Sequence, residues 1–336
     1  MASSQPQRES VMIDDPVLVD DWHVVARTED VGENEVAAAR LLGEDLVLWR
    51  RDGQVMAWRD LCVHRGTRLS LGEVDELGLM CAYHGWVYDE SGACVHIPSR
   101  PKQKPPARAC AVTYQVIERY GLVWVSLGEP SNDVPVFEVW DEPDYRHVLG
   151  GPYTVRASAP RLIENFLDAT HFPFVHEGIL GSRDHADLGD YDVEAGPTGI
   201  RASNIETWTP DPDGSGEAKM ARWLYRVLRP LTATIDLTLP DGGPERYAMY
   251  FAVTPVDEGE CVGWMWNSMN YNHDLPDSEF LAYIDEIVYQ DLPVVESQRP
   301  ELLPLDPKAE FHVKADATAI AYRRWLRELG VTFGVR

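Results

Sequence analysis

The N-terminal fold is decided by two segments, Cys62-Val63-His64-Arg65-Gly66 and Cys81-Ala82-Tyr83-His84-Gly85-Trp86. Each segment supplies one cysteine and one histidine, and sixteen residues separate His64 from Cys81. Two thiolates and two imidazoles on paired loops form a set of metal ligands. The segments therefore predict a metal centre within the first third of the chain.

Two kinds of centre use these ligands. Tetrahedral zinc accepts two cysteines and two histidines, whereas a Rieske [2Fe–2S] cluster binds one iron through two cysteines and the other through two histidines. Zinc sites more often take a pair of cysteines from one loop. Because each segment here supplies one cysteine and one histidine, each loop can reach both irons, and the pattern favours the cluster. The glycines after the histidines are expected to let the backbone approach and donate N–H groups to sulfur.

The sequence around these segments is typical of a small antiparallel β domain. Strand-like runs occupy 46–49, 55–58 and 122–125, and Asp52-Gly53 between the first two is a strong hairpin signal. The polar, turn-rich run 128–133 is the expected boundary. We therefore expect a cluster domain with an N-terminal extension over 1–132 and a second domain over 133–336.

The second domain mixes two periodicities, which predicts an α+β fold. Runs 247–253 and 262–266 are strand-like, and the loop-like run 210–216 is expected to join two strands. Apolar residues at helical spacing predict a helix over 278–289, and another is expected over 316–329, ended by Gly330. The expected architecture is an antiparallel sheet with helices packed against it.

A second ligand set lies within residues 164–176. Two histidines and a carboxylate are the side chains that hold a mononuclear ferrous ion and leave positions open for oxygen and substrate. Asp168 and His171, three residues apart, are expected to share a helix face. His171 and His176 are five apart, so an unbroken helix would point them about 140° apart. Pro173 is expected to break the helix between them and let both converge on one metal.

The third ligand must come from elsewhere. Asp291 follows the predicted helix 278–289, but the helix and the residues after it contain four candidate carboxylates, and spacing alone does not choose among them. They are Asp285, Glu286, Asp291 and Glu296.

Together the two ligand sets resemble those of the Rieske non-haem iron oxygenases, specifically the oxygenase (alpha) subunits of ring-hydroxylating and vanillate O-demethylase-like enzymes. The resemblance extends through Val87-Tyr88-Asp89 and Gly92, is strong over 161–178, and is weaker over 285–298. It implies an N-terminal Rieske domain and a C-terminal helix-grip (START/Bet v1-like) catalytic domain. The implied cluster ligands are Cys62, His64, Cys81 and His84, and the implied ligands of Fe(II) are His171, His176 and Asp291.

The resemblance also implies roles for two residues that do not bind iron. Asp168 is expected to bridge His171 to a cluster histidine, His84, of a neighbouring subunit, which implies a homotrimer. The alternative for Asp168 is a helix-surface carboxylate. Asn165 is expected to line the active site, and the alternative is an amide that satisfies nearby backbone groups.

The activity implied by the resemblance is oxygenation with O₂ and electrons from NADH or NADPH. The expected reaction is monooxygenation of a small aromatic molecule, by hydroxylation or by O- or N-demethylation. One alternative is a ring cis-dihydroxylating dioxygenase with the same metals. The other is an electron-transfer protein whose second domain is not catalytic. No glycine-rich dinucleotide loop is evident, so the expected redox partner is separate: a ferredoxin, a flavin-containing reductase, or both.

The bulk composition limits the other partners. The chain has 55 acidic and 30 basic residues and a formal charge of −25, which disfavours nucleic acid. Met1 to Asp15 lacks the apolar core of a secretory signal, and no run is long and apolar enough to span a membrane. Five scattered cysteines do not suggest a disulfide framework, and Cys94, Cys110 and Cys261 are expected to be small buried hydrophobes. The expected location is the cytoplasm.

Substrate specificity is expected to lie in 180–275, where the resemblance is weakest. The aromatic residues Trp264, Trp266 and Tyr271 are candidates for lining a substrate cavity. Candidate partners for an anionic substrate, none of them singled out by a pattern, are Arg201, Arg222, Arg226, Arg229 and Arg246.

Overall fold

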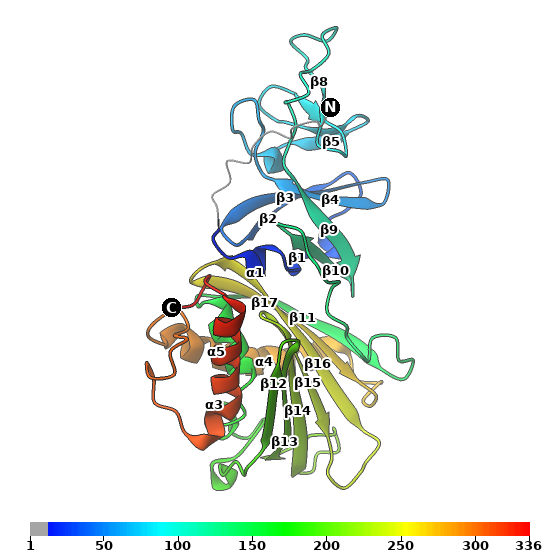
Figure 1. The fold of residues 1–336 in the computed structure, drawn as a ribbon. Coiled ribbons are helices and arrows are strands. Elements are labelled where there is room, and N and C mark those ends of the chain that lie inside the picture. The colour runs from blue at the N-terminus through cyan, green and yellow to red at the C-terminus, as the bar shows by residue number, and fades with distance from the viewer. Residues whose placement is uncertain (1–12) are drawn as a thin grey trace. The chain divides into compact units, whose positions relative to one another are not determined.

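The computed structural model describes residues 13–336 and divides into two compact units, Met1–Val134 and Pro135–Arg336 (Figure 1). The predictions for the first fifteen residues fall largely outside the described part. The fold is α+β, as predicted. Between residues 13 and 336, no helix is both long and apolar enough to cross a bilayer.

The first unit contains two antiparallel sheets, which confirms the predicted β domain. Asp52 (φ 50°) and Gly53 (φ 75°) form the predicted two-residue hairpin turn between β3 (Glu44–Arg51) and β4 (Gln54–Arg59). The two positive φ angles of this turn suit Asp-Gly. In sheet order, the larger sheet contains β1 (His23–Arg27), β10 (Leu122–Ser126), β9 (Thr113–Arg119), β4 (Gln54–Arg59), β3 (Glu44–Arg51) and β2 (Val36–Leu41). The smaller contains β5 (Glu73–Asp75), β6 (Gly78–Met80), β7 (Val87–Tyr88) and β8 (Cys94–His96).

The core of this unit fixes the start of both ligand loops. Trp49 and Trp58 pack edge to face with ring centroids 4.9 Å apart, and Cys62 and Cys81 belong to the same buried cluster. The first ligand loop follows β4 and the second joins β6 to β7. The short helical segments of this unit are α1 (Pro16–Val19), η1 (Thr28–Asp30) and η2 (Leu69–Leu71).

The second unit is built on one seven-stranded antiparallel sheet. Figure 1 shows α3 (Phe172–Val175), α4 (Asp277–Ser297) and α5 (Ala317–Leu329) on the same side of this sheet. Helix α2 (Ala159–Phe166) contacts two strands of the sheet, β16 (Arg246–Asp257) and β17 (Glu260–Met269). In sheet order, the strands are β11 (Arg146–Val155), β17 (Glu260–Met269), β16 (Arg246–Asp257), β15 (Thr232–Thr238), β14 (Lys219–Arg229), β13 (Gly199–Thr209) and β12 (Asp192–Gly196). The helical segments are α2 (Ala159–Phe166), α3 (Phe172–Val175), η3 (Arg183–His185), α4 (Asp277–Ser297), η4 (Lys314–Asp316) and α5 (Ala317–Leu329).

The predicted elements of this unit are present, with one correction. The strand-like runs lie in β16 and β17, the run 210–216 joins β13 to β14, and α5 ends at Gly330. Helix α4, however, continues eight residues past the predicted end, through Pro293 to Ser297. Buried Val295 and an ion pair between Arg156 and Glu296 hold its last turn, so packing outweighs the hydrogen bond that Pro293 cannot donate.

A buried ionic network holds α2 against α5. Arg323, on α5, forms a two-pronged pair with Glu164 of α2 at 2.5 and 2.7 Å and also bonds Glu310 at 2.5 Å. Arg161 of α2 bonds the other oxygen of Glu310 at 2.9 Å. The network fixes the helix that carries Asn165 and immediately precedes Asp168.

Candidate metal centres and substrate cavity

The two cysteine–histidine loops have the same backbone hydrogen bonds. In each, the cysteine N–H donates to the carbonyl five residues on, and the glycine N–H donates to the carbonyl of the cysteine. The distances are 2.8 Å for Cys62 N to Thr67 O and Cys81 N to Trp86 O, and 2.9 Å for Gly66 N to Cys62 O and Gly85 N to Cys81 O. The repeat of one loop conformation presents the two ligand pairs in equivalent ways.

The predicted role of the two glycines as donors to sulfur is wrong. Their N–H groups bond the cysteine carbonyls, and the Cys81 sulfur instead accepts from the backbone of Tyr83 and His84. The glycines are required for another reason. Gly66 (φ +72°) and Gly85 (φ +65°) adopt the left-handed conformation, which costs little without a Cβ.

The four side chains separate into a sulfur pair and a nitrogen pair. The Cys62 and Cys81 thiols lie within hydrogen-bonding distance of each other and are each 2% exposed, and burial raises the pKa of the Cys81 thiol. The rings of His64 and His84 lie further out, with centroids 4.5 Å apart. A two-iron cluster with one sulfur-bound and one nitrogen-bound iron requires this separation.

Two further contacts bear on whether a cluster fits. His64 Nδ1 is a buried nitrogen without a hydrogen-bond partner among residues 13–336, as expected for an atom reserved for a metal. Its ring stacks on Trp86 at 4.3 Å. The Tyr88 hydroxyl lies 3.1 Å from Cys62 Sγ, where it can donate to the sulfur. The residues present therefore fit a Rieske cluster.

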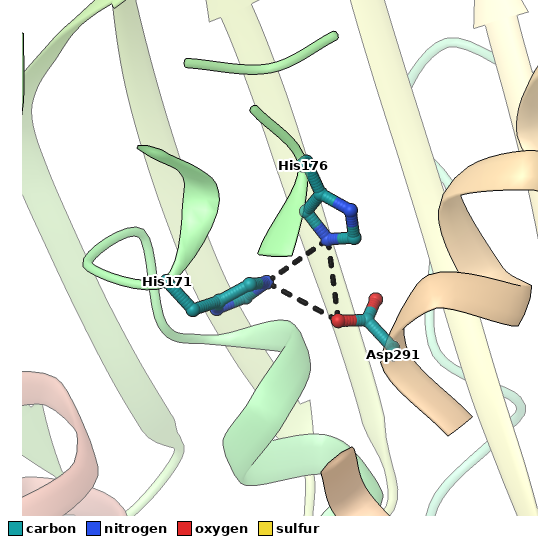
Figure 2. Close-up of side chains that lie close together, drawn as sticks. All are labelled: His171, His176 and Asp291. Carbon is teal, nitrogen blue, oxygen red and sulfur yellow. Dashed lines mark hydrogen bonds and ion pairs between the residues drawn. The ribbon is translucent and has the colours of Figure 1, made fainter. Parts of the chain in front are cut away.

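His171, His176 and Asp291 converge on one point (Figure 2). His171 Nε2 lies 3.2 Å from His176 Nε2 and 3.4 Å from Asp291 Oδ1, and His176 Nε2 lies 3.2 Å from Asp291 Oδ1. His176 is 1% exposed, and the other two side chains are 15% exposed. Three donor atoms grouped in this way can occupy one face of a single metal ion.

The local fold explains this convergence. α3 is one turn long, and His171 and His176 are the residues that flank its two ends. Pro173 stands in the first turn of α3, where its missing N–H has no intrahelical partner to lose. Pro173 therefore starts a new short helix instead of ending a longer one. Asp291 comes from inside α4, whereas the sequence suggested a position after that helix.

Side chains outside the group of three donor atoms orient the imidazole rings of His171 and His176. His176 Nδ1 lies 2.8 Å from Gln290 Oε1, and His171 Nδ1 lies 3.4 Å from Asp168 Oδ2. With a proton on each Nδ1, both rings donate to these oxygens and leave Nε2 free to bind a metal. Asn165 donates to Asp291 Oδ1 at 3.4 Å.

Asp168 does not share a helix face with His171, contrary to the expectation from their spacing. α2 ends at Phe166, and Asp168 lies in the connection to α3. Its Oδ1 accepts from the Thr170 N–H and hydroxyl at 2.7 and 2.6 Å, which turns Oδ2 toward His171. The side chain remains 36% exposed.

Local electrostatics set the charge of these groups. Burial raises the pKa of Asp168, but hydrogen bonds from His171 and Thr170 outweigh burial and leave the pKa below its ordinary value. Burial lowers the pKa of His176, but the adjacent Asp291 outweighs it, so the pKa of His176 is raised. The lowered pKa of Asp168 keeps this carboxylate anionic beside His171.

An apolar cavity of about 430 Å³ adjoins the three converging residues. His171, His176 and Asp291 contribute to its wall, together with Asn165. The remainder of the wall is largely aromatic and aliphatic, from α2, α4 and the sheet. A cavity of this size and polarity suits a small organic molecule.

The predictions for the cavity were partly wrong. Tyr271 lines it, but Trp264 and Trp266 do not. Within residues 13–336, none of the five candidate arginines contributes to the wall; Arg222 and Arg226, for example, pair with Glu206 and Asp236. The predicted specificity region 180–275 also omitted the helix that forms much of the wall, α4.

Sequence reasoning did not identify Gln290, Thr170 or Tyr88 as parts of the two centres. Amides, hydroxyls and phenols occur throughout the chain, and their contacts depend on the fold. A weak signal was available for Gln290, because it immediately precedes Asp291. Of the three remaining cysteines, Cys94 and Cys261 are buried as expected, and Cys110 is partly buried.

Two family models match the chain. Residues 21–116 match the Rieske [2Fe-2S] domain, and residues 155–332 match the vanillate O-demethylase oxygenase C-terminal domain. The two matches contain, respectively, the four cluster-type ligands and the three converging residues of the second unit.

Full-length relatives carry both regions. Methylxanthine N1-demethylase NdmA of Pseudomonas putida is 30% identical, with 92% of this chain and 88% of the relative covered. Its solved structure with caffeine has a TM-score of 0.82, at 30% identity over 93% of this chain and 91% of that chain. TsaM2 of Comamonas testosteroni, described as a putative toluene-4-sulfonate monooxygenase system iron-sulfur subunit, is 31% identical over 91% of this chain and 94% of its own length.

A partial match concerns a different kind of protein. Oxidoreductase NdmD of Pseudomonas putida is 40% identical over 117 residues, which cover 34% of this chain and 20% of NdmD.

Proposed function

We propose that this chain, which belongs to the Rieske non-haem iron oxygenases with a vanillate O-demethylase type catalytic domain, monooxygenates a small aromatic molecule. Among monooxygenation reactions, we propose demethylation, in which the methyl group of the substrate is released as formaldehyde. The observation that carries the proposal is the convergence of His171, His176 and Asp291 at the wall of an apolar cavity. Family membership makes the chain an iron-dependent oxidoreductase.

We assign the metals as follows. Cys62, His64, Cys81 and His84 would hold the cluster, and His171, His176 and Asp291 would hold Fe(II). When bound, these groups supply electrons one at a time and activate O₂ for attack on a C–H bond. The assignment is supported by the separated sulfur and nitrogen pairs and by the three grouped donor atoms. Residues 1–132 and 133–336 are the two domains that we assign to these centres.

The protein side chains have three tasks in this mechanism. Gln290 and Asp168 hold the protons on the Nδ1 atoms of His176 and His171, which keeps each Nε2 directed at the metal. Asn165 restrains the orientation of Asp291. The apolar wall would bind the aromatic part of a substrate and hold its methyl group near His171, His176 and Asp291.

We further propose a homotrimer in which Asp168 accepts a hydrogen bond from His84 of a neighbouring copy. The support is that Asp168 bonds His171 while its side chain remains 36% exposed. A partly exposed carboxylate that already holds one imidazole can accept a second N–H donor.

A separate reductase is the partner that delivers electrons, and the match to NdmD is consistent with such a system. We propose that it draws on NADH or NADPH, directly or through a ferredoxin. The proposed location is the cytoplasm, where a reducing environment keeps the five cysteines unpaired, as they are in the structure.

Single turnover tests this function. Protein replete in iron is reduced chemically, exposed to O₂ and incubated with aromatic methyl ethers, N-methyl compounds and aromatic acids, and the products are analysed by mass spectrometry. Formaldehyde, or insertion of one oxygen atom, is expected. Addition of two hydroxyl groups to a ring would replace the proposal with ring dihydroxylation.

The variant His176→Ala is the control for the iron assignment. It should lose turnover and Fe(II) while the visible spectrum of the cluster stays unchanged, because Cys62 and Cys81 are buried in the core of the first unit. Full activity in this variant would remove His176 from the ligand set.

A further inference from the structure

The helix that walls the cavity carries only negative charge. α4 contains six acidic residues and neither lysine nor arginine. More widely, the side chains between residues 13 and 336 that line the cavity include no lysine or arginine. Apart from the proposed iron ligand Asp291, the charged members of the wall are Asp211 and Glu279. A carboxylate or sulfonate on a substrate would therefore meet no counter-ion within the cavity.

Two basic side chains that contact loops bordering the cavity are held by other acids. Arg146 pairs with Asp277 and donates to two backbone carbonyls of the loop before α4. Lys219 pairs with Asp213 and also contacts a serine hydroxyl of the 210–216 loop. Neither cation is available to an anionic ligand unless an existing ion pair breaks.

Tyrosine rings form a second feature of the wall. Tyr153, Tyr247, Tyr271 and Tyr283 all line the cavity, and burial raises the pKa of each phenol. Three of the hydroxyls already donate to protein oxygens. A ligand in the cavity would therefore contact the rings of these tyrosines and not their O–H groups. The three bonds are Tyr153 to Asp285 Oδ1 at 2.7 Å, Tyr247 to Asn267 Oδ1 at 2.5 Å and Tyr271 to the Pro212 carbonyl at 3.3 Å.

Two of these tyrosines, Tyr271 and Tyr283, lie near the acids of the cavity wall, where the wall is more exposed. Asp211, Glu279 and Tyr283 are exposed, whereas His176 at the metal end is 1% exposed. The charge of Asp211 contributes to the raised pKa of both Tyr271 and Tyr283. A ligand whose reacting end is beside the iron ligands would direct its far end to these groups.

We infer that the cavity selects aromatic substrates that carry a positively charged nitrogen at the end remote from the reacting methyl group. Asp211 and Glu279 would attract the charge, and the faces of Tyr271 and Tyr283 would contact the cation. At the exposed mouth the cation keeps part of its hydration, so little desolvation cost opposes binding. This inference rests on the proposed function for the position of the reacting end.

The test compares three probes that share a 4-methoxyphenyl group. They are 4-methoxybenzylamine, protonated at pH 7, the neutral 4-methoxybenzamide and the anionic 4-methoxybenzoate. Dissociation constants are measured calorimetrically under anaerobic conditions with the full chain, replete in iron. The amine should bind about fivefold more tightly than the amide, and the benzoate about fivefold more weakly, as expected for one charge at 4 Å in water.

Variants localise the effect. In Asp211→Asn and in Glu279→Gln, the preference for amine over amide should fall about twofold each, and in the double variant it should be lost, because the two carboxylates share the fivefold effect. Glu217→Gln is the matched control, because it removes one charge from the segment that joins β13 to β14 at a residue that does not line the cavity. The preference should be unchanged in this control.

The outcomes separate this inference from the proposed function. If the amine is preferred but no probe releases formaldehyde or gains an oxygen atom in single turnover, the inference stands and the proposed function is contradicted. Formaldehyde released mainly from the benzoate, with the benzoate also binding best, would retain the function and overturn the inference. Equal binding of all three probes, or binding of none, would also overturn it.

Discussion

The proposed iron ligands are oriented by residues that are not themselves proposed to bind the iron. Gln290 accepts from His176 Nδ1 at 2.8 Å, and Asp168, itself held by Thr170, faces His171 Nδ1. When the Nδ1–H group of a histidine donates to an acceptor, the ring is held in one orientation and its Nε2 atom is available to bind a metal. These contacts define the centre as much as the identity of its three ligands.

Replacing Gln290 with Leu should weaken Fe(II) binding about 10- to 100-fold, because the His176 ring loses the acceptor that fixes it. The measurement is an anaerobic Fe(II) titration of the metal-free catalytic site. Gln290→Glu keeps an acceptor oxygen and should bind Fe(II) nearly as tightly as the original protein. Equal weakening in both variants would show that the hydrogen bond is not the cause.

Replacing Tyr88 with Phe should lower the reduction potential of the cluster by about 40 mV, which corresponds to about 1 kcal/mol for one hydrogen bond and one electron. The hydroxyl lies 3.1 Å from Cys62 Sγ, and a hydrogen bond to sulfur stabilises the reduced cluster. Redox titration followed by visible absorption measures the change. Tyr83→Phe, which keeps the ring packed against His84, should leave the potential unchanged.

Residue type and spacing predicted the ligand candidates but not their supporting contacts. Cysteine and histidine are uncommon in this chain, so the pairs Cys62/His64 and Cys81/His84 indicate a metal site by their spacing alone. Gln290 was not found, because it meets His176 from 114 positions away. The choice of Asp291 among four nearby acids came from a resemblance, and the structure adds that Asp291 faces both histidines.

At the scale of elements, short helices and buried charges position the catalytic unit. α3 is a single turn, and its two flanking residues converge because so little helix separates them. The spacing of His171 and His176 correctly excluded a continuous helix. It could not predict that Pro173 lies in the first turn of α3, because a proline is compatible with either the end or the start of a helix.

Arg323→Met should destabilise the protein by about 3 kcal/mol, since the buried Glu164 loses its two-pronged partner and keeps only a longer contact to Arg161 at 3.7 Å. The measurement is the chemical unfolding transition of the catalytic unit. Arg324→Met is the matched control, because Arg324 is the next residue of α5 and is exposed. Its effect should be within about 0.5 kcal/mol.

For the whole molecule, the two candidate metal centres lie in different compact units. The four cluster-type ligands fall within Met1–Val134, and the three proposed iron ligands fall within Pro135–Arg336. The sequence predicted two domains and an α+β class from turn composition and periodicity. It could not predict the wall of the cavity, because strands and helices distant in sequence supply that wall.

Removal of the mononuclear iron should therefore leave the cluster intact. A mild Fe(II) chelator should abolish turnover while the visible spectrum of the cluster persists. Fe(II) added back at about one hundred times its dissociation constant should stabilise the catalytic unit by about 2.7 kcal/mol. Thermal unfolding with and without Fe(II) tests this shift, and parallel loss of the cluster spectrum would contradict the independence of the centres.

The two nitrogens of the His171 ring face different surroundings, and this arrangement affects how the substrate specificity of the enzyme can change by mutation. Nε2 faces the cavity wall, whereas Nδ1 faces Asp168, which does not line that cavity. Mutations that reshape the cavity therefore need not alter the groups around Asp168. New substrates could be acquired, in evolution or by design, one wall residue at a time, without rebuilding the side through which we expect the neighbouring subunit to act.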